Sequence, residues 1–125
     1  MFILLVKRFQ RFIIIISHIK YLMKPYLLKD GELKELFAKI PGWEIKSNLI
    51  EREFNFANFL EAFSFMTKVA LICEKYNHHP NWENVYSKVI IKLTTHDLGG
   101  ISNLDQTIAS EINSIYDKSV ENNNN

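Results

Sequence analysis

The sequence predicts an α+β domain in which helices pack on one face of an antiparallel sheet. Apolar residues three or four positions apart, typical of helices, alternate along the chain with stretches in which apolar and polar residues alternate, typical of half-buried strands. The elements follow in the order helix, hairpin, helix, hairpin, helix, which favours one layer of helices on one sheet. With 125 residues, 47% of them hydrophobic, the chain is long enough for one such domain and too short for two.

The first two predicted elements are a short helix and a β-hairpin. Asp30 is a plausible N-cap for a helix over residues 30–40, and a Pro-Gly pair ends it. Residues 43–45 and 50–56 then alternate apolar and polar side chains, and a Lys-Ser-Asn segment between them supplies the turn. The apolar residues at helical spacing in the helix are Leu33, Leu36, Phe37 and Ile40.

The central helix is the clearest element in the chain. Asn58 begins it, with Glu61 placed to return a side chain to the cap, and it ends near Asn77 because Pro80 cannot continue a helix. Cys73, the only cysteine, excludes an internal disulfide, favours a reducing compartment, and is interpreted as a small buried hydrophobe. We expect a core stripe of Phe59, Ala62, Phe63, Met66, Val69, Ala70 and Cys73.

The C-terminal third predicts strand structure and then a last helix. Residues 82–95 form either one long strand or a second hairpin that turns at Ser87-Lys88, and periodicity alone does not decide between them. A Gly-Gly pair breaks the chain, and the segment from Ser102 to Asp105 matches a capping box that opens a helix. The apolar stripe of this helix is Ile108, Ile112 and Ile115, expected to be core or a self-association surface.

Both ends of the chain differ from this body. Residues 1–22 combine two short apolar runs with basic residues and contain no acid, and neither run approaches the ~20 residues needed to cross a bilayer. This extension is either an organelle-targeting segment or a stretch upstream of the true start at Met23, and we favour the second interpretation. The predicted domain therefore covers residues 23–118, with a cytoplasmic location, and residues 119–125 form an Asn-rich tail expected to be disordered.

The charge distribution argues against nucleic acid as a direct ligand. The formal net charge is +1, but all six basic residues up to Lys29 precede the first acid, Asp30. From Asp30 onward there are nine Lys or Arg and fourteen Asp or Glu, a balance of −5. An acidic body offers no stripe of cations to neutralise phosphates.

Three of the four histidines, His78, His79 and His96, lie in one short stretch with two carboxylates, Glu74 and Asp105. Imidazole gains and loses protons near neutral pH, so several imidazoles brought together indicate acid–base chemistry. A metal site is not expected, because the stretch lacks an HExxH motif and a cysteine pair. The alternative is structural: the histidine pair only ends its helix, near the negative end of the helix dipole.

The neighbouring side chains allow both functional and structural interpretations. Glu74, one helical turn before His78, could orient an imidazole or hold a ligand, or it is a solvated acid in the last turn. Asp105 has a structural role at the third position of its helix. Trp82 and Tyr86 are flat side chains that could form a wall for a planar ligand or belong to the core.

These residues resemble the signature of the pterin-4a-carbinolamine dehydratases in order and spacing. The similarity extends over residues 25–117, and the Gly42-Trp43 entry into the first hairpin also fits. Ser87 stands where the family often has Asn, which affects the hairpin turn and not the chemistry. The matching residues are Glu74, His78-His79-Pro80, Trp82, Asn84-Val85-Tyr86, Lys88-Val89, Thr94-Thr95-His96, Gly100 and Asp105.

The resemblance implies a four-stranded antiparallel sheet with three helices, usually in a homodimer or homotetramer. It also implies a hydro-lyase that removes water from 4a-hydroxytetrahydropterin to give quinonoid dihydropterin, in tetrahydrobiopterin recycling, without a metal or organic cofactor. In this interpretation His79 and His96 form the acid–base pair and His78 positions the hydroxyl. The expected substrate-binding residues are Glu74, Trp82, Tyr86, Thr95 and Asp105, with Asp105 also orienting His96.

A second function is implied by the same resemblance, because some members of the family act as dimerisation partners of a transcription factor. Such a non-catalytic binding module needs an exposed apolar helix surface and no histidines. The stripe of Ile108, Ile112 and Ile115 is the candidate for that surface, although such stripes are more commonly core.

Overall fold

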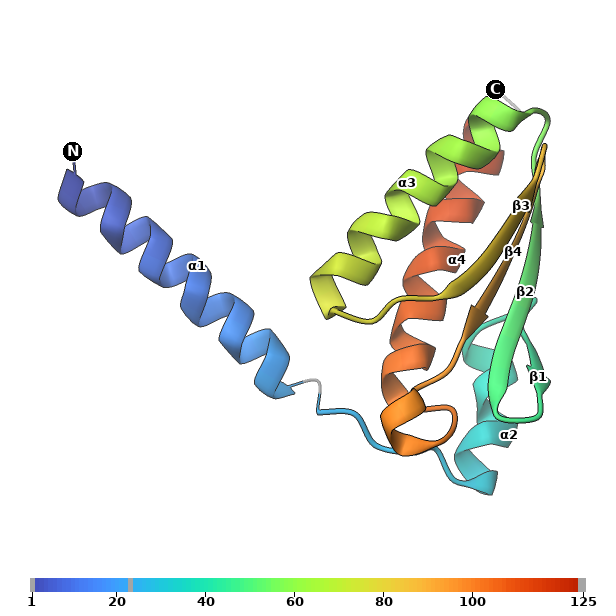
Figure 1. Cartoon of the computed structure of the whole chain (residues 1–125), viewed down its shortest axis with the longest axis horizontal. Coiled ribbons are helices and arrows are strands. Elements are labelled where there is room, and N and C mark those ends of the chain that lie inside the picture. The colour runs from blue at the N-terminus through green and yellow to red at the C-terminus, as the bar shows by residue number, and fades with distance from the viewer. Residues whose placement is uncertain (1, 23, 124–125) are drawn as a thin grey trace.

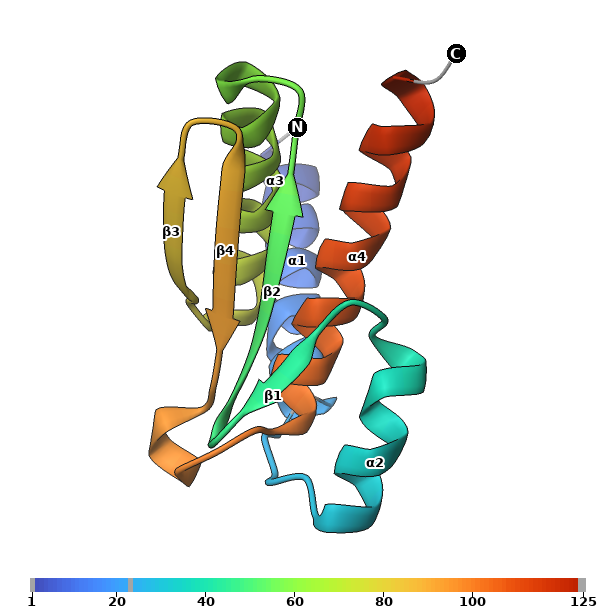
Figure 2. The same ribbon diagram turned by 90° about the vertical axis from the view of Figure 1, so that its right-hand side faces the viewer.

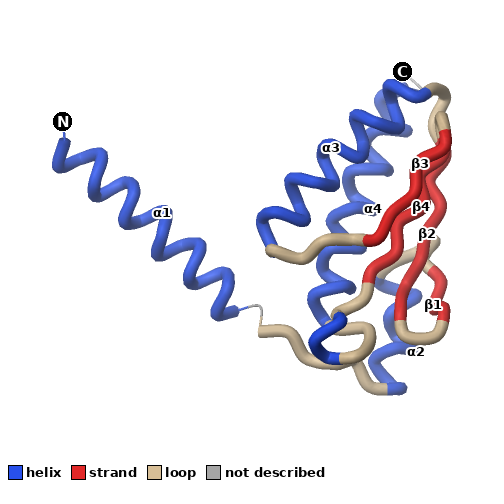
Figure 3. The backbone as a smooth tube through the Cα atoms, in the orientation of Figure 1, coloured by secondary structure: helices blue, strands red, loops and turns tan. Residues whose placement is uncertain are grey.

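The body of the protein is built on one four-stranded antiparallel sheet. The computed structural model describes residues 2–22 and 24–123, apart from the side chains of residues 16–22 and 123. The strand order is β1-β2-β4-β3, and every neighbouring pair is antiparallel (Figures 1 and 3). The strands are β1 Glu44–Lys46, β2 Leu49–Asn55, β3 Asn81–Val85 and β4 Lys88–Leu93. The second hairpin is therefore formed, and the single long strand is not.

Three helices cover one face of this sheet, which confirms the α+β prediction (Figure 2). They are α2 Asp30–Lys39, α3 Phe59–Tyr76 and α4 Asn103–Asn123, and a short 3-10 helix, η1 His96–Leu98, joins the sheet to α4. A fourth helix, α1 Phe2–Leu22, precedes them and stands away from the body (Figure 1). No helix in the described part of the chain is long and apolar enough to cross a membrane.

The core lies between the inward face of the sheet and helices α3 and α4. In β4, Val89, Ile91 and Leu93 are fully buried and alternate with partly exposed residues, as expected for a strand with one covered face. The helix α4 contributes Ile108 and Ile112, both 0% exposed. These two residues of the predicted stripe are therefore core and are not available as a partner surface.

The predicted stripe of α3 needs one correction. The helix buries Ala62, Phe65, Val69, Ile72 and Cys73, which recur every three or four residues. The expected core residues Phe59 and Phe63 are instead about half exposed. The first two turns contain Phe59, Phe63 and Phe65. Only Phe65 lies on the same side of the helix as the buried Val69 and Ile72, so it is the phenylalanine that enters the core.

The other face of the sheet carries a row of alternating charges across all four strands. Lys46 pairs with Glu51, Glu51 lies 3.8 Å from Lys92, and Lys92 lies 2.8 Å from Glu83. Cross-strand pairs of opposite charge favour the observed register by a few tenths of a kcal/mol each, about 0.2–1. This face is therefore suited to water, and the domain has two layers.

Two helix ends differ from the predictions. The N-cap of α2 is Lys29 and not Asp30, because the Glu32 carboxylate accepts a hydrogen bond from the Lys29 backbone N–H at 2.8 Å. The helix α4 continues through Asn122 and Asn123, where a disordered tail was predicted, and residues 124–125 lie outside the described residues. Starting a helix is costly, but adding residues to an existing helix is not. Asparagines, which favour helices weakly, can therefore extend the packed helix α4.

Candidate active site

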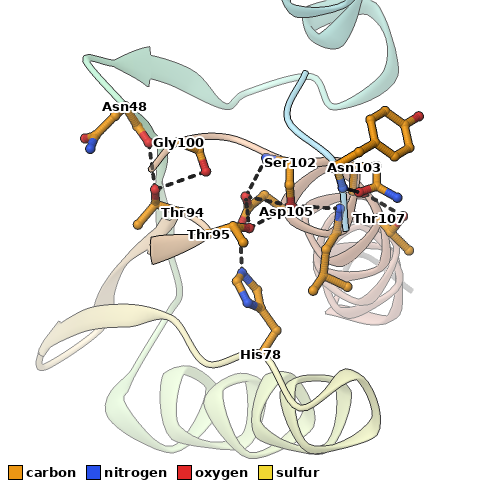
Figure 4. Close-up of polar contacts among 11 residues, drawn as sticks. Asn48, His78, Thr94, Thr95, Gly100, Ser102, Asn103, Asp105 and Thr107 are labelled. Atoms are coloured by element: carbon orange, nitrogen blue, oxygen red, sulfur yellow. Dashed lines mark hydrogen bonds and ion pairs between the residues drawn. The ribbon is translucent and has the colours of Figure 1, made fainter. Parts of the chain in front are cut away.

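The position of His78 is fixed by the way in which α3 ends. Asn77 adopts the left-handed conformation, with φ 49° and ψ 46°. The His78 backbone N–H then bonds to the Cys73 carbonyl at 3.0 Å, and the Asn77 N–H bonds to the Glu74 carbonyl at 3.2 Å. This is the Schellman arrangement, which closes the helix and turns the chain sharply. The next side chain, His78, is directed toward the start of α4 (Figure 4).

His78 contacts a buried carboxylate at the start of α4. Its Nε2 atom lies 2.6 Å from Oδ1 of Asp105, which is 0% exposed (Figure 4). The second oxygen, Oδ2, accepts hydrogen bonds from the Ser102 backbone N–H and from the Thr95 hydroxyl, both at 2.8 Å. Thr95 and Ser102 also bond to each other through their hydroxyls at 2.6 Å. All four residues belong to one hydrogen-bonded network.

The network determines which nitrogen of His78 carries a proton. A carboxylate only accepts hydrogen bonds, so Nε2–H of His78 is the donor to Asp105. In the neutral imidazole, Nδ1 is then the acceptor, free of the proton. Oδ2 of Asp105 is occupied by Ser102 and Thr95, so Oδ1 is the oxygen left for His78. Asp105 therefore fixes both the tautomer and the orientation of the ring.

Asp105 confirms one prediction and contradicts another. It accepts a hydrogen bond from the Ser102 N–H and so caps α4, as its capping-box position predicted. The imidazole that it orients is His78, however, and not His96. The Thr95 side chain is buried and faces Asp105, whereas the next residue, His96, begins the 3-10 helix and is exposed.

His79 forms a second, exposed pair with a carboxylate. Its Nε2 atom lies 2.7 Å from Oε1 of Glu74, and the two side chains are 56% and 75% exposed. Both interpretations of Glu74 therefore hold in part: its carboxylate contacts an imidazole, that of His79 and not of His78, and it is also solvated. Because the pair is in water, it contributes little to stability and serves mainly to orient the ring.

The three imidazoles are brought to one end of the sheet. His78 and His79 precede β3, whose first residue, Asn81, pairs with Lys92 near the end of β4. His96 follows β4 by three residues, directly after Thr95. His78 is partly buried, and His79 and His96 are exposed. Among the residues that the structure describes, no group of three or more His, Cys, Asp or Glu could hold a metal ion.

The two aromatic candidates lie in different places. Trp82 is partly buried, packs against the core, and is near the start of β3. Tyr86 is 66% exposed and lies in the turn between β3 and β4, with φ 53°. That turn is at the opposite end of the hairpin from His79. Trp82 therefore lies at the same end of the hairpin as the histidines, and Tyr86 lies at the other end.

One member of the network was assigned only a capping role by the sequence. Ser102 accepts a hydrogen bond from the Leu104 N–H at 3.2 Å and bonds to Thr95. Because Thr95 donates its one hydroxyl proton to Oδ2 of Asp105, Ser102 is the donor in the bond between the two hydroxyls. The Ser102 hydroxyl also lies 3.3 Å from the same oxygen of Asp105. The capping-box match placed Ser102 near Asp105, but only the fold brings Thr95 to the same point.

The comparison with known proteins decides the family. A sequence model described as pterin 4 alpha carbinolamine dehydratase matches residues 26–115. The chain belongs to this family. A dehydratase is a hydro-lyase, so the protein that carries the histidine cluster belongs to a family of enzymes. The matched range contains the whole sheet, α2, α3 and the site, and it leaves α1 outside.

Relatives and solved structures agree with the family. A relative from Prochlorococcus marinus (strain MIT 9312), provisionally named a pterin-4-alpha-carbinolamine dehydratase, is 81% identical over 96 residues, 77% of this chain and 100% of its own. A second, from strain SARG, is 48% identical over 93 residues, 74% of this chain and 97% of its own. A crystal structure described as a transcriptional coactivator/pterin dehydratase from Brucella melitensis is 36% identical. It has a TM-score of 0.70 and covers 73% of this chain and 99% of its own.

Proposed function

We propose that the domain, residues 23–118, dehydrates 4a-hydroxytetrahydropterin to quinonoid dihydropterin through its histidines. The observation that supports this most is the bond between His78 and the buried Asp105, 2.6 Å long, at the end of the sheet that also carries His79 and His96. A buried carboxylate that holds one imidazole in one tautomer is typical of acid–base sites. Family membership supplies the substrate class.

The reaction needs two proton transfers. The hydroxyl on the ring carbon leaves as water after it receives a proton, and the adjacent ring nitrogen loses its proton, so that a carbon–nitrogen double bond forms. One imidazolium can deliver the first proton and one neutral imidazole can remove the second. We assign these two transfers to His79 and His96, which are exposed and can reach a ligand that enters from solvent.

His78 has a different role in this proposal. Its Nε2–H is committed to Asp105, so Nδ1 is the atom that can face the substrate. As an acceptor, Nδ1 can take a hydrogen bond from the substrate hydroxyl and hold it beside the proton donor. Correct positioning of reacting groups lowers the barrier by several kcal/mol, up to roughly 7–11 in the best intramolecular cases. Glu74 holds the His79 ring in place through its contact with Nε2.

The test is dehydration of 4a-hydroxytetrahydropterin by the purified full chain. We expect His79→Ala and His96→Ala each to lower kcat by about 10²- to 10⁴-fold, the usual contribution of one proton-transfer group. The matched control is His18→Ala, because His18 lies outside the family match at residues 26–115. Wild-type protein that is no faster than buffer would remove the proposal.

The second candidate function is association, either with copies of the same chain in a homodimer or homotetramer or with another protein. The helix α3 offers a surface for it. The helix α3 exposes Leu60, Phe63 and Leu71 to 74%, 54% and 68%. Apolar side chains grouped on one helix favour contact with another protein surface. The neighbour from Brucella melitensis is described as a coactivator as well as a dehydratase. Because the stripe of α4 is buried, α3 replaces it as the candidate surface.

The location that we propose is the cytoplasm. Cys73, the only cysteine, is a buried free thiol that makes no disulfide. Proteins without disulfides are typical of reducing compartments. Activity recovered from the cytoplasm of fractionated cells, free or bound to the membrane around it, would agree, and activity confined to an organelle would contradict it.

A further inference from the structure

The helix α1 exposes an unusual amount of apolar surface. Phe2, Phe9 and Phe12 are 81%, 65% and 60% exposed, and Leu4 and Leu5 are each about two-thirds exposed. The helix stands away from the body (Figure 1). Exposed apolar patches of this kind mark sites that contact a protein or a membrane.

The phenylalanines and the cations of α1 lie on different sides of the helix, although Leu4 and Ile14 lie among the cations. Phe2, Leu5, Phe9 and Phe12 are spaced by three, four and three positions, which places them on one side. Lys7 and Arg11, four positions apart, share the opposite side, and Arg8 lies at its edge. The segment 1–22 also contains Lys20 and has no Asp or Glu.

We propose that residues 1–22 belong to the working protein, contrary to the start at Met23 that the sequence favoured, and that α1 binds the surface of an anionic lipid bilayer. Its phenylalanine side would lie in the boundary between headgroups and acyl chains. Helices that combine Phe and Leu on one side with Lys and Arg on the other lie in this boundary. The unbalanced positive charge is complementary to anionic headgroups. Binding that depends on these cations distinguishes a lipid surface from a second copy of α1, which would cover the phenylalanine side without contacting them.

The charges also define how α1 sits on the bilayer. Lys7, Arg8 and Arg11 lie in the second and third turns of the helix, and a crossing helix would carry them into the hydrocarbon. Lying flat, the helix keeps these cations among the headgroups. The chain from residue 30 onward has a balance of −5, so the acidic body is repelled from the same surface and stays in water.

The experiment is co-sedimentation of the full chain with vesicles. One set contains phosphatidylcholine alone, and the other contains equal parts of phosphatidylcholine and phosphatidylglycerol. We expect binding to the second set only, with loss at about 1 M salt, where the screening length falls to about 3 Å. The triple variant Lys7→Gln, Arg8→Gln, Arg11→Gln should bind roughly 100-fold more weakly, about fivefold for each cation. The matched control, with the same charge change on the body, is Lys34→Gln, Lys39→Gln, Lys118→Gln, and it should bind like wild type.

A second variant tests the apolar side. Phe9→Ser with Phe12→Ser should also weaken binding to the anionic vesicles while leaving the charge unchanged. The proposal is overturned by equal binding to both vesicle sets, by no binding, or by a triple variant that binds like its control. It is also overturned if the chain without lipid forms an oligomer that the two phenylalanine substitutions dissociate, since a second copy would then cover α1. None of these outcomes bears on dehydration by the body.

Discussion

His78 and Asp105, 27 residues apart in the chain, are joined by a 2.6 Å contact between Nε2 and Oδ1. The carboxylate is fully buried, and its other oxygen accepts from Thr95 and Ser102. A buried carboxyl group is stable only when its oxygens are hydrogen-bonded, and the network provides partners for both oxygens of Asp105. The predictions for the site follow from this pair.

Replacing the carboxylate by an amide should disturb the tautomer of His78. In Asp105→Asn, an NH₂ group that faces His78 would donate to Nε2, so the ring proton would move to Nδ1 and remove the acceptor. An NH₂ group turned the other way would face the donors of Ser102 and Thr95. We expect kcat/KM to fall by about 10²- to 10⁴-fold and the free energy of unfolding to fall by about 1–3 kcal/mol.

The measurement combines the dehydration rate with ¹⁵N NMR of the His78 ring. The control is Asp97→Asn, an exposed carboxylate on the short helix η1, and it should leave both readouts unchanged. An unchanged His78 tautomer in Asp105→Asn would show that the carboxylate does not set it.

The Thr95 hydroxyl should support Asp105 from behind. Thr95→Val keeps the shape of the side chain but removes a donor to a buried charged acceptor, which is 2.8 Å away. We expect the free energy of unfolding to fall by about 1.5–3 kcal/mol, the usual contribution of a hydrogen bond to a charged group. We also expect kcat to fall with little change in KM, since Thr95 acts through Asp105.

Thr95→Ser is the matched variant, because it retains the hydroxyl and loses only a methyl group. Urea denaturation followed by steady-state kinetics measures both effects. A Val variant as stable and active as the Ser variant would contradict a role for the hydroxyl.

The sequence predicted the local elements of the site well and its long-range contact poorly. The end of α3 and the cap of α4 depend on neighbours within a few residues, Pro80 for the first and Ser102 with Asp105 for the second. Which imidazole meets Asp105 depends instead on how β3 and β4 pair and on which side the residues after β4 face. Thr95 turns inward and His96 does not, and this places His78 at the carboxylate.

The fold shows the same division. The first hairpin and the helices of the body followed from periodicity, but the second hairpin did not. The side of α3 that faces the sheet did not follow either, because Phe59, Phe63 and Phe65 are equally apolar. Tertiary packing selected Phe65. The helical state of residues 2–22 was also not predicted, since the segment is apolar on more than one side and lacks an acidic first turn.

The left-handed turn at Asn77 should be sensitive to the residue that occupies it. With φ 49°, Asn77 adopts a conformation that costs most residues about 1–2 kcal/mol and that Gly and Asn adopt readily. We expect Asn77→Ala to lower the free energy of unfolding by about 1 kcal/mol and Asn77→Gly to leave it nearly unchanged. Urea denaturation compares the two, and equal losses would indicate that the Asn side chain matters more than the backbone conformation.

Cys73 should remain an unreactive thiol in the folded protein. Burial raises the pKa of its thiol to about 11, and the side chain is 1% exposed. Because the pKa of an unfolded cysteine is lower, alkaline pH deprotonates the unfolded state first, so stability should fall as the pH rises from about 9 toward 11. Cys73→Ala should lose less stability over this range.

Thiol alkylation checks the same point. At pH 8 the wild-type protein should react with iodoacetamide much more slowly than free cysteine and should reach that rate only in denaturant. Rapid alkylation of the folded chain would show that Cys73 is accessible.

The apolar surface of α3 should determine the oligomeric state. Leu60 is 74% exposed in the single chain, and the rings of Phe59 and Phe63 lie 5.7 Å apart beside it. If this surface joins copies of the chain, Leu60→Glu places a charge in the interface, which costs several kcal/mol when no partner charge is present. We therefore expect light scattering after size exclusion to give a smaller mass for Leu60→Glu than for wild type.

Val120→Glu, at an exposed apolar residue near the end of α4, should keep the wild-type mass. Because Leu60 makes no part of the core, both variants should fold, and an unchanged mass for Leu60→Glu would leave α3 as a surface for a different protein partner or for none.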